Sequence, residues 1–233
     1  MDMKNVPFAS HEVRWFFDGA VDLHPALRSW FESSSPVRKK GDFGPPVWMG
    51  RLDGQPDVYL LVPGADDMGI KWREGNFQIK GRAASLGVHE FCGRFQGSVE
   101  RWMRWSYAKM PESYRRLFTD GDNKGLLTVS VRKTRALRKL RLDTYNGSAE
   151  EVDPKAFIDR GINFELTDLE IGGKSYCTVA FEAYPDDSAM HDAFNRTVET
   201  FLDGLEGVDL GAVNSMSYPA WLLGRGTGGR PSR

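Results

Sequence analysis

Residues 69–82 read Gly-Ile-Lys-Trp-Arg-Glu-Gly-Asn-Phe-Gln-Ile-Lys-Gly-Arg, and this stretch decides the fold class of the chain. Lys71 and Arg73 occupy alternate positions before the central Glu-Gly-Asn, and Lys80 and Arg82 do so after it. A period of two interrupted by a short glycine-containing turn is typical of a β-hairpin. Because successive side chains of a strand point to opposite faces, the stretch predicts two neighbouring antiparallel strands that turn these four cations onto one face.

The same period of two recurs through most of the chain and predicts further strands. We expect strands at Ser10–Phe16, Asp57–Val62, Phe95–Tyr107 and Leu126–Arg135, and a hairpin of Asn163–Ile171 with Lys174–Tyr184. Apolar residues at helix spacing predict helices near Leu23–Glu32, Glu112–Phe118 and Ser188–Leu205, the last with Ser188 as its N-cap. The chain is therefore expected to fold as an α+β protein that is mainly antiparallel β.

The composition limits the classes of protein to which the chain can belong. Its 233 residues are 40% hydrophobic and 12% aromatic, enough to bury one core without a disulfide or a metal. Its 31 basic and 32 acidic side chains leave a formal net charge of −1, so we expect neither nucleic acid nor a membrane as partner. Residues 1–223 are expected to form a single domain, and the Gly- and Arg-rich residues 224–233 a disordered tail.

Three features bear on localisation. Cys92 and Cys177 lie far apart and outside any C-x-x-C, which favours reduced thiols. The first residues of the chain carry charges and lack the apolar core of a signal peptide. No apolar run is long enough for a transmembrane helix. Together they predict a cytoplasmic protein.

The alternating cations allow two interpretations. They face solvent if the strands belong to an open sheet with one wet face. They point inward if the strands close into a barrel, and many inward cations then require an anion. The sequence contains no Walker A loop, no G-x-S-x-G and no H-E-x-x-H, so P-loop, serine hydrolase and zincin mechanisms have no support.

Five short stretches carry a resemblance to one known family. They are Ser10–Arg14, a degenerate E-x-E-x-K; Ile70–Gly81, two basic strands around a turn, ending in Lys-Gly; Lys133–Arg135, a K-x-R; Phe181–Glu182, an acidic strand before a helix; and Ser215–Leu222, an S-Y-x-x-L-L-like segment. In this order they resemble the motifs of the CYTH or triphosphate tunnel superfamily, which includes thiamine triphosphatases, inorganic tripolyphosphatases and class IV adenylate cyclases. The resemblance extends over almost the whole chain.

The resemblance implies an eight-stranded antiparallel tunnel, closed or nearly closed, with flanking helices, a triphosphate-binding interior and Mg²⁺ or Mn²⁺ as cofactor. It implies catalytic roles for Glu12, Arg14, Lys71 and Arg73. It implies substrate-binding roles for Lys80, Arg82, Arg101, Lys133 and Arg135, with Arg104 as the alternative inward residue of the strand that carries Arg101. Metal ligation would fall to Glu12, Glu165 and Glu182.

Two departures from the family's first motif bear on catalysis. Ser10 stands where the family has its first glutamate, and Arg14 where it has lysine; a hydroxyl is a poorer ligand than a carboxylate for a hard divalent cation. The leading hypothesis is a metal-dependent phosphohydrolase, a triphosphatase that acts on a triphosphate or polyphosphate. The alternatives are a catalytically degenerate protein that binds a phosphorylated or other organic anion without turnover, and a tunnel repurposed as a scaffold. The expected partner is a small-molecule anion, and the expected assembly a monomer or homodimer.

Overall fold

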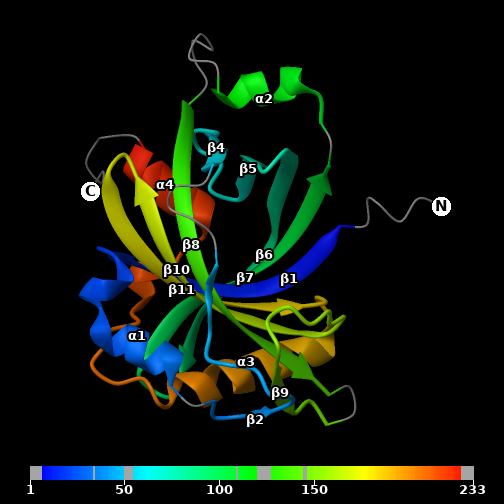
Figure 1. Ribbon diagram of the computed structural model, residues 1–233, viewed down its shortest axis with the longest axis vertical. Helices are drawn as coiled ribbons and strands as arrows, with labels where there is room; N and C mark the ends of the chain where they lie inside the picture. Colours follow the sequence, from blue (N-terminus) through cyan, green and yellow to red (C-terminus); the bar gives the residue numbers. More distant parts are fainter. Residues whose placement is uncertain are drawn as a thin grey trace, which may run out of the picture.

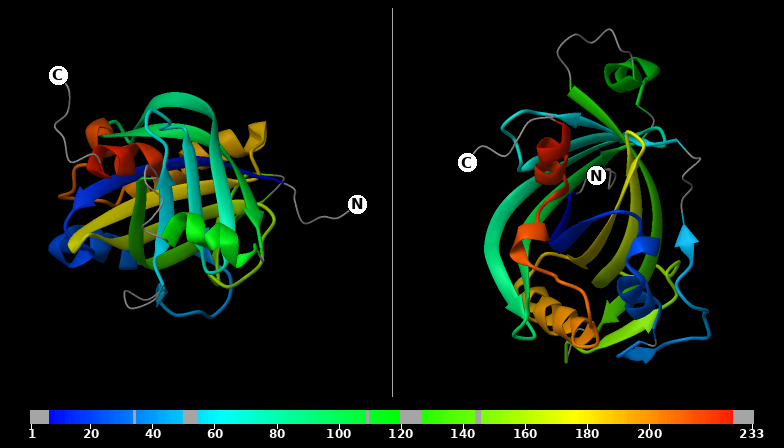
Figure 2. Two further views of the ribbon diagram at one scale, coloured as in Figure 1. Left: turned by 90° about the horizontal axis from the view of Figure 1, so that it is seen from above. Right: turned by 90° about the vertical axis from the view of Figure 1, so that its left-hand side faces the viewer.

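The computed structural model describes residues 7–33, 35–49, 55–108, 110–119, 127–143 and 146–226. Eight antiparallel strands form a closed barrel in the order β8–β10–β11–β1–β7–β6–β5–β4, and β4 pairs with β8 to complete the ring (Figures 1 and 2). Their bounds are β1 (Phe8–Asp18), β4 (Asp57–Leu61), β5 (Met68–Arg73), β6 (Asn76–Phe91), β7 (Phe95–Tyr107), β8 (Leu127–Leu142), β10 (Gly161–Ile171) and β11 (Lys174–Tyr184). The predicted fold, mainly antiparallel and tunnel-like with flanking helices, is confirmed.

The hairpin that decides the fold class forms as predicted. Strands β5 and β6 pair from Met68 with Gly81 to Arg73 with Asn76. The two residues between them, Glu74 and Gly75, have φ of 49° and 78°, the left-handed conformation that a tight type I′ hairpin turn requires. Strand β6 then runs on for 16 residues, with register shifts after Arg82 and after Ser85, and such bulges increase the bending of a strand around a barrel.

Strand β8 and the hairpin of β10 with β11 also correspond to predicted strands. Strand β8 continues past Arg135 to Leu142, and the hairpin of β10 with β11 turns at Gly172-Gly173. The short strands β2 (Arg38–Lys39), β3 (Trp48–Met49) and β9 (Ala149–Val152) extend the sheet outside the ring. The glycines at positions 121 and 125 also predict a turn, and this stretch lies outside the described residues.

Helices cover the barrel at several places. They are α1 (Pro25–Glu32), α2 (Glu112–Thr119), α3 (Ser188–Leu202) and α4 (Tyr218–Gly226), with 3₁₀ turns at Val21–Leu23 and Ala212–Asn214. In Figure 1, α1 and α3 lie at the lower end and α2 at the upper end. The N-cap of α3 is Asp187, whose carboxylate accepts from the Met190 amide at 2.9 Å, so the prediction of Ser188 was one residue off.

Helix α4 crosses the expected boundary between the domain and its tail, which was placed after residue 223. Helix α4 continues through residues 224–226, so these residues belong to the helix and not to a tail; residues 227–233 lie outside the described part of the chain. Among the described residues, no helix is long and apolar enough to cross a membrane.

The apolar core has two main parts. The larger packs α1 and α3 against the barrel, where the rings of Phe164 and Phe181 stack at 4.4 Å between centroids and Phe201 of α3 approaches both. The smaller part joins α4 to the barrel through the stacked rings of Phe16 and Trp221, 4.5 Å apart. Because Phe16 has the same strand parity as Glu12 and Arg14, this second cluster extends into the barrel interior.

Candidate functional site

The barrel encloses a cavity of about 370 Å³ whose wall is strongly charged. Every strand of the ring except β4 contributes a charged side chain to the wall, β4 contributes Tyr59, and α4 contributes Tyr218. The cationic wall residues are Arg14, Lys71, Arg73, Lys80, Arg104, Lys133 and Arg135, and the acidic ones are Glu12, Glu74, Glu100, Glu165 and Glu182. Of the two interpretations of the alternating cations, the inward one therefore agrees with the structure.

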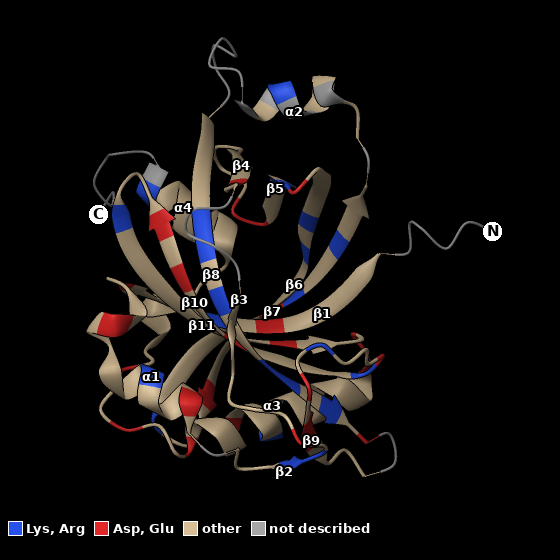
Figure 3. Cartoon of the chain, in the orientation of Figure 1, with Lys and Arg blue, Asp and Glu red and all other residues tan. Residues whose placement is uncertain are grey.

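The two signs of charge are separated around the ring. Lysines and arginines come mainly from β5, β6 and β8, whereas the carboxylates come mainly from the adjacent strands β10, β11, β1 and β7. Figure 3 shows this separation as blue bands on β6 and β8 and a red band on β1. The cavity consequently has a basic side and an acidic side.

On the basic side, three cations converge on one buried carboxylate. Asp57 Oδ2 lies 3.0 Å from Lys71 Nζ and 3.3 Å from Lys133 Nζ, and Asp57 Oδ1 lies 3.6 Å from Arg73 Nε. Burial alone would raise the pKa of Asp57, but Lys133 and Lys71 outweigh it and lower that pKa. Asp57 was not among the predicted site residues, because nothing in its sequence environment distinguishes it from any acidic residue at the start of a strand.

The ammonium groups of Lys71 and Lys133, called the lysine pair below, are poorly compensated. Burial, and then the charge of Lys71, lower the pKa of Lys133 well below its ordinary value; burial lowers that of Lys71 as well. Lys133 Nζ also donates to the Tyr59 hydroxyl at 2.6 Å and lies 4.1 Å from the centroid of the Tyr218 ring. The folded protein thus holds more positive charge here than Asp57 neutralises.

Glu165 is held between two arginines. Arg14 Nη2 donates to Oε1 at 2.7 Å, and Arg135 Nη1 donates to Oε2 at 2.9 Å. Burial would raise the pKa of Glu165, but the two guanidinium groups outweigh it and hold that pKa far below the ordinary value. Both oxygens of this expected metal ligand are therefore already bonded.

On the acidic side, three carboxylates lie on adjacent strands. Glu12 of β1 is directly opposite Glu182 of β11 and also directly opposite Glu100 of β7. Glu12 Oε1 accepts from the Ser10 hydroxyl at 2.6 Å and from the Lys80 ammonium, and Lys80 Nζ lies 3.7 Å from Glu182 Oε1. We call Glu182, Glu12 and Glu100 the carboxylate row.

The side chains as they are placed do not fit the Mg²⁺ or Mn²⁺ ion that the family resemblance implies. Within the described part of the chain, no group of three or more His, Cys, Asp or Glu side chains is arranged to hold a metal ion. Of the three expected ligands, Glu165 has both oxygens on arginines, and Glu12 and Glu182 have Lys80 between them. Hard divalent cations need open oxygen ligands, which these contacts occupy.

Of the expected site residues, only Arg82 and Arg101 are not on the cavity wall. Arg82 donates to Glu100 at 2.8 Å and to Asp66 at 3.2 Å, and Arg101 makes a bidentate pair with Asp186. Arg101 is the strand neighbour of Glu100 and Trp102, which face the cavity, so its own side chain points outward.

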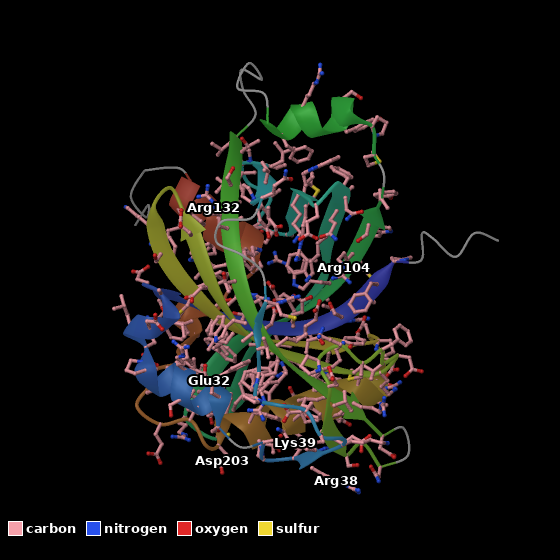
Figure 4. All side chains as sticks on the ribbon, in the orientation of Figure 1. Glu32, Arg38, Lys39, Arg104, Arg132 and Asp203 are labelled. Atoms are coloured by element: carbon pink, nitrogen blue, oxygen red, sulfur yellow. The ribbon has the colours of Figure 1, made fainter. Side chains whose placement is uncertain are left out.

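Arg104 is the inward arginine of β7. It has the same strand parity as Glu100, it lines the cavity, and its guanidinium carbon lies 4.4 Å from the centroid of the Phe8 ring. Figure 4 labels it on β7. The sequence left Arg101 and Arg104 as alternatives because residues 100–105 place charged and aromatic side chains on both faces of the strand.

Tyr218 brings an unused polar group to the wall. Its hydroxyl is buried and has no hydrogen-bond partner among the described residues. Its ring lies parallel to that of Tyr59, 5.9 Å away, and the Arg14 guanidinium carbon lies 5.0 Å from its centroid. A buried hydroxyl without a partner costs free energy unless a ligand supplies one.

Fold and site together define a class of protein: a closed antiparallel barrel that encloses an ion-paired, net cationic cavity. No protein-family model matches the sequence, and comparisons with curated proteins and with solved structures found no match.

Proposed function

We propose that the chain binds a small polyanion of the triphosphate type in the barrel cavity, without turnover. The observation that carries the proposal is the convergence of Lys71, Lys133 and Arg73 on the single carboxylate of Asp57. Buried charges are ordinarily paired, and an unpaired one is costly. A phosphorylated ligand would supply the missing negative charge.

The remaining wall supports the same ligand chemistry. Counting Asp57 with the acidic wall residues still leaves the cations in excess. Arg104 and Arg135 add guanidinium groups, whose planar donors suit phosphate oxygens. A volume of about 370 Å³ is within the usual range for small-ligand sites.

Metal-dependent hydrolysis of a triphosphate is a second candidate function, and the carboxylate row is the observation that favours it. Phosphoryl transfer needs mainly positioning and charge neutralisation, which the basic side could provide. The hydrolase would further need carboxylate oxygens free to ligate a metal, and in the folded protein those oxygens are ion-paired. Binding without turnover therefore agrees better with the geometry.

Calorimetric titration with tripolyphosphate in the presence of EDTA tests the proposal. We expect saturable binding and a rise in the thermal unfolding temperature, because a ligand that binds only the folded state stabilises it. We expect no phosphate release from tripolyphosphate, thiamine triphosphate or ATP with Mg²⁺ or Mn²⁺. Absence of both heat and thermal shift would refute anion binding, and phosphate release would favour the hydrolase instead.

The pH dependence of the same titration locates the anion. In the free protein the pKa of Lys133 lies well below its ordinary value. A bound anion favours the protonated form and raises this pKa. Binding should therefore take up protons at pH values between the lowered pKa of the free protein and the raised pKa of the complex, and affinity should fall as pH rises through that range. Titrations in two buffers of different ionisation enthalpy measure the uptake; equal apparent enthalpies would place the anion elsewhere.

Tyr218→Phe tests whether the buried hydroxyl contacts the ligand. Since hydrogen bonds to charged groups contribute about 1.5–3 kcal/mol, we expect tripolyphosphate affinity to fall roughly 10- to 100-fold. The stability of the ligand-free protein should be unchanged or slightly higher, because the hydroxyl has no partner there. Tyr107→Phe is the matched control, because Tyr107 packs against Phe77 and is not on the cavity wall. An affinity unchanged by Tyr218→Phe would exclude this contact.

A further inference from the structure

The carboxylate row needs a positive counter-ion, because its three carboxylates would otherwise repel one another. Glu182, Glu12 and Glu100 are directly opposite one another on β11, β1 and β7. Side chains in such positions have Cβ atoms about 5 Å apart, and like charges there repel. The exposed fractions of the Glu12 and Glu182 side chains are only 14% and 16%, so water screens this repulsion weakly.

One end of the row has its own partners. Glu100 accepts from Arg82 at 2.8 Å through Oε1 and from the Trp102 indole N–H at 3.0 Å through Oε2. Both oxygens of Glu100 therefore have partners other than Lys80. Glu12 and Glu182 depend on another cation.

That cation is the ammonium group of Lys80. Its Nζ contacts Glu12 Oε1 and lies 3.7 Å from Glu182 Oε1, so a single positive charge bridges two carboxylates on neighbouring strands. Burial would raise the pKa of Glu12, but Lys80 outweighs it and lowers that pKa; burial and the charge of Glu12 raise the pKa of Glu182. The Trp102 ring, with its centroid 5.7 Å from Nζ, adds a cation–π contact.

We infer that Lys80 is the resident cation of the carboxylate row and stands where a divalent metal ion would otherwise bind between Glu12 and Glu182. Two carboxylates with water or phosphate oxygens suffice to hold Mg²⁺ or Mn²⁺, provided that no ammonium group lies between them. The positive charge between these two carboxylates is therefore supplied by a side chain of the protein and not by a bound metal ion. This inference rests on the proposed function. If the barrel binds tripolyphosphate, it should do so without a metal ion.

Removal of the Lys80 ammonium group tests directly whether Lys80 takes the place of a metal ion between Glu12 and Glu182. We expect Lys80→Gln to bind Mn²⁺ at least about tenfold more tightly than the wild-type protein, measured by electron paramagnetic resonance without any anion, because a like charge is removed at close range. Lys80→Arg keeps the charge and is the matched control, which should bind Mn²⁺ as weakly as the wild type. Adding Glu182→Gln to Lys80→Gln should remove the gained affinity. Equal Mn²⁺ affinity of Lys80→Gln and the wild type would overturn the inference.

The wild-type protein provides a test that does not depend on the folding of any variant. Its tripolyphosphate affinity should agree within about twofold in EDTA and in excess Mg²⁺, after correction for the metal bound by free tripolyphosphate. A requirement for metal, or wild-type Mn²⁺ binding that Glu12→Gln abolishes, would overturn the inference. If no tripolyphosphate binds at all, the proposed function fails, while the Mn²⁺ comparison still decides the role of Lys80.

Discussion

Lys133→Met is expected to weaken tripolyphosphate binding roughly 10- to 100-fold and, at the same time, to raise the stability of the ligand-free protein. Loss of a charge-assisted hydrogen bond accounts for the first effect. The second follows because the Lys133 ammonium is buried beside Lys71 and shares Asp57 with it, so its charge is poorly compensated. Asp57 keeps Lys71 and Arg73 after the change, so no buried charge is left alone.

Replacement of an uncompensated buried charge by an apolar side chain of similar size should raise the free energy of unfolding by about 1–2 kcal/mol. Urea denaturation measures this change, and calorimetry with tripolyphosphate measures the affinity. Arg132→Met is the control on the same strand: Arg132 pairs with Glu170 at the surface, and Figure 4 labels it at the upper part of β8. The control should alter stability by less than about 1 kcal/mol and leave affinity unchanged.

Lower tripolyphosphate affinity together with higher stability distinguishes a ligand-binding lysine from a structural one. A structural lysine would lower stability when replaced and leave anion affinity unaffected. If Lys133→Met destabilises the protein and binds tripolyphosphate normally, the lysine pair is part of the scaffold and not of the binding site.

Glu151→Gln is expected to lower the free energy of unfolding by about 3–5 kcal/mol, because it leaves the buried guanidinium of Arg138 without a counter-ion. The exposed fractions of the Arg138 and Glu151 side chains are 2% and 3%. Their two bonds, Nε to Oε1 at 3.0 Å and Nη2 to Oε2 at 2.7 Å, are bidentate.

Arg138 also connects the barrel to the first helix. Its Nη1 donates to the Phe31 carbonyl at 3.0 Å and to the Ser33 carbonyl at 3.2 Å, which satisfies carbonyl groups at the end of α1. The ion pair therefore joins β8, β9 and α1. Breaking the ion pair should therefore destabilise all three elements together, as a single cooperative unfolding transition at lower urea concentration.

Glu150→Gln is the matched control for this prediction, because Glu150 is the strand neighbour of Glu151 and pairs with Lys40 and Arg141 near the surface. It should cost less than about 1 kcal/mol. The double variant Arg138→Met with Glu151→Leu should regain most of the lost stability, since no unpaired charge remains. Urea denaturation compares all three proteins. Equal losses for Glu150→Gln and Glu151→Gln would show that burial of the pair is not what makes it costly to break.

Alternation along the chain was enough to predict most strands and the residues that share a face on each. Lys71 with Arg73, and Lys133 with Arg135, line the cavity as their parity requires. Where both faces of a strand carry charges and rings, parity alone did not choose, and Arg101 and Arg104 remained alternatives until Asp186 was seen to hold Arg101 outside. The end of α4 at Gly226 was missed because Arg225 contacts Asp18 and the Tyr176 ring, which are far away along the chain, and local propensity does not report such contacts.

By itself the sequence determined the strands, the basic hairpin at residues 69–82 and the inventory of charges, because these depend on local periodicity. Only the tertiary structure decided which way the charges face and how they pair. The pairing of β4 and β10 with β8 closes the ring and turns the cations inward. Cross-strand register then places Lys80 between Glu12 and Glu182, and Glu165 between Arg14 and Arg135. Residues so distant along the chain meet only through barrel closure, and the ion pairs that result occupy the carboxylate oxygens that a metal ion would need.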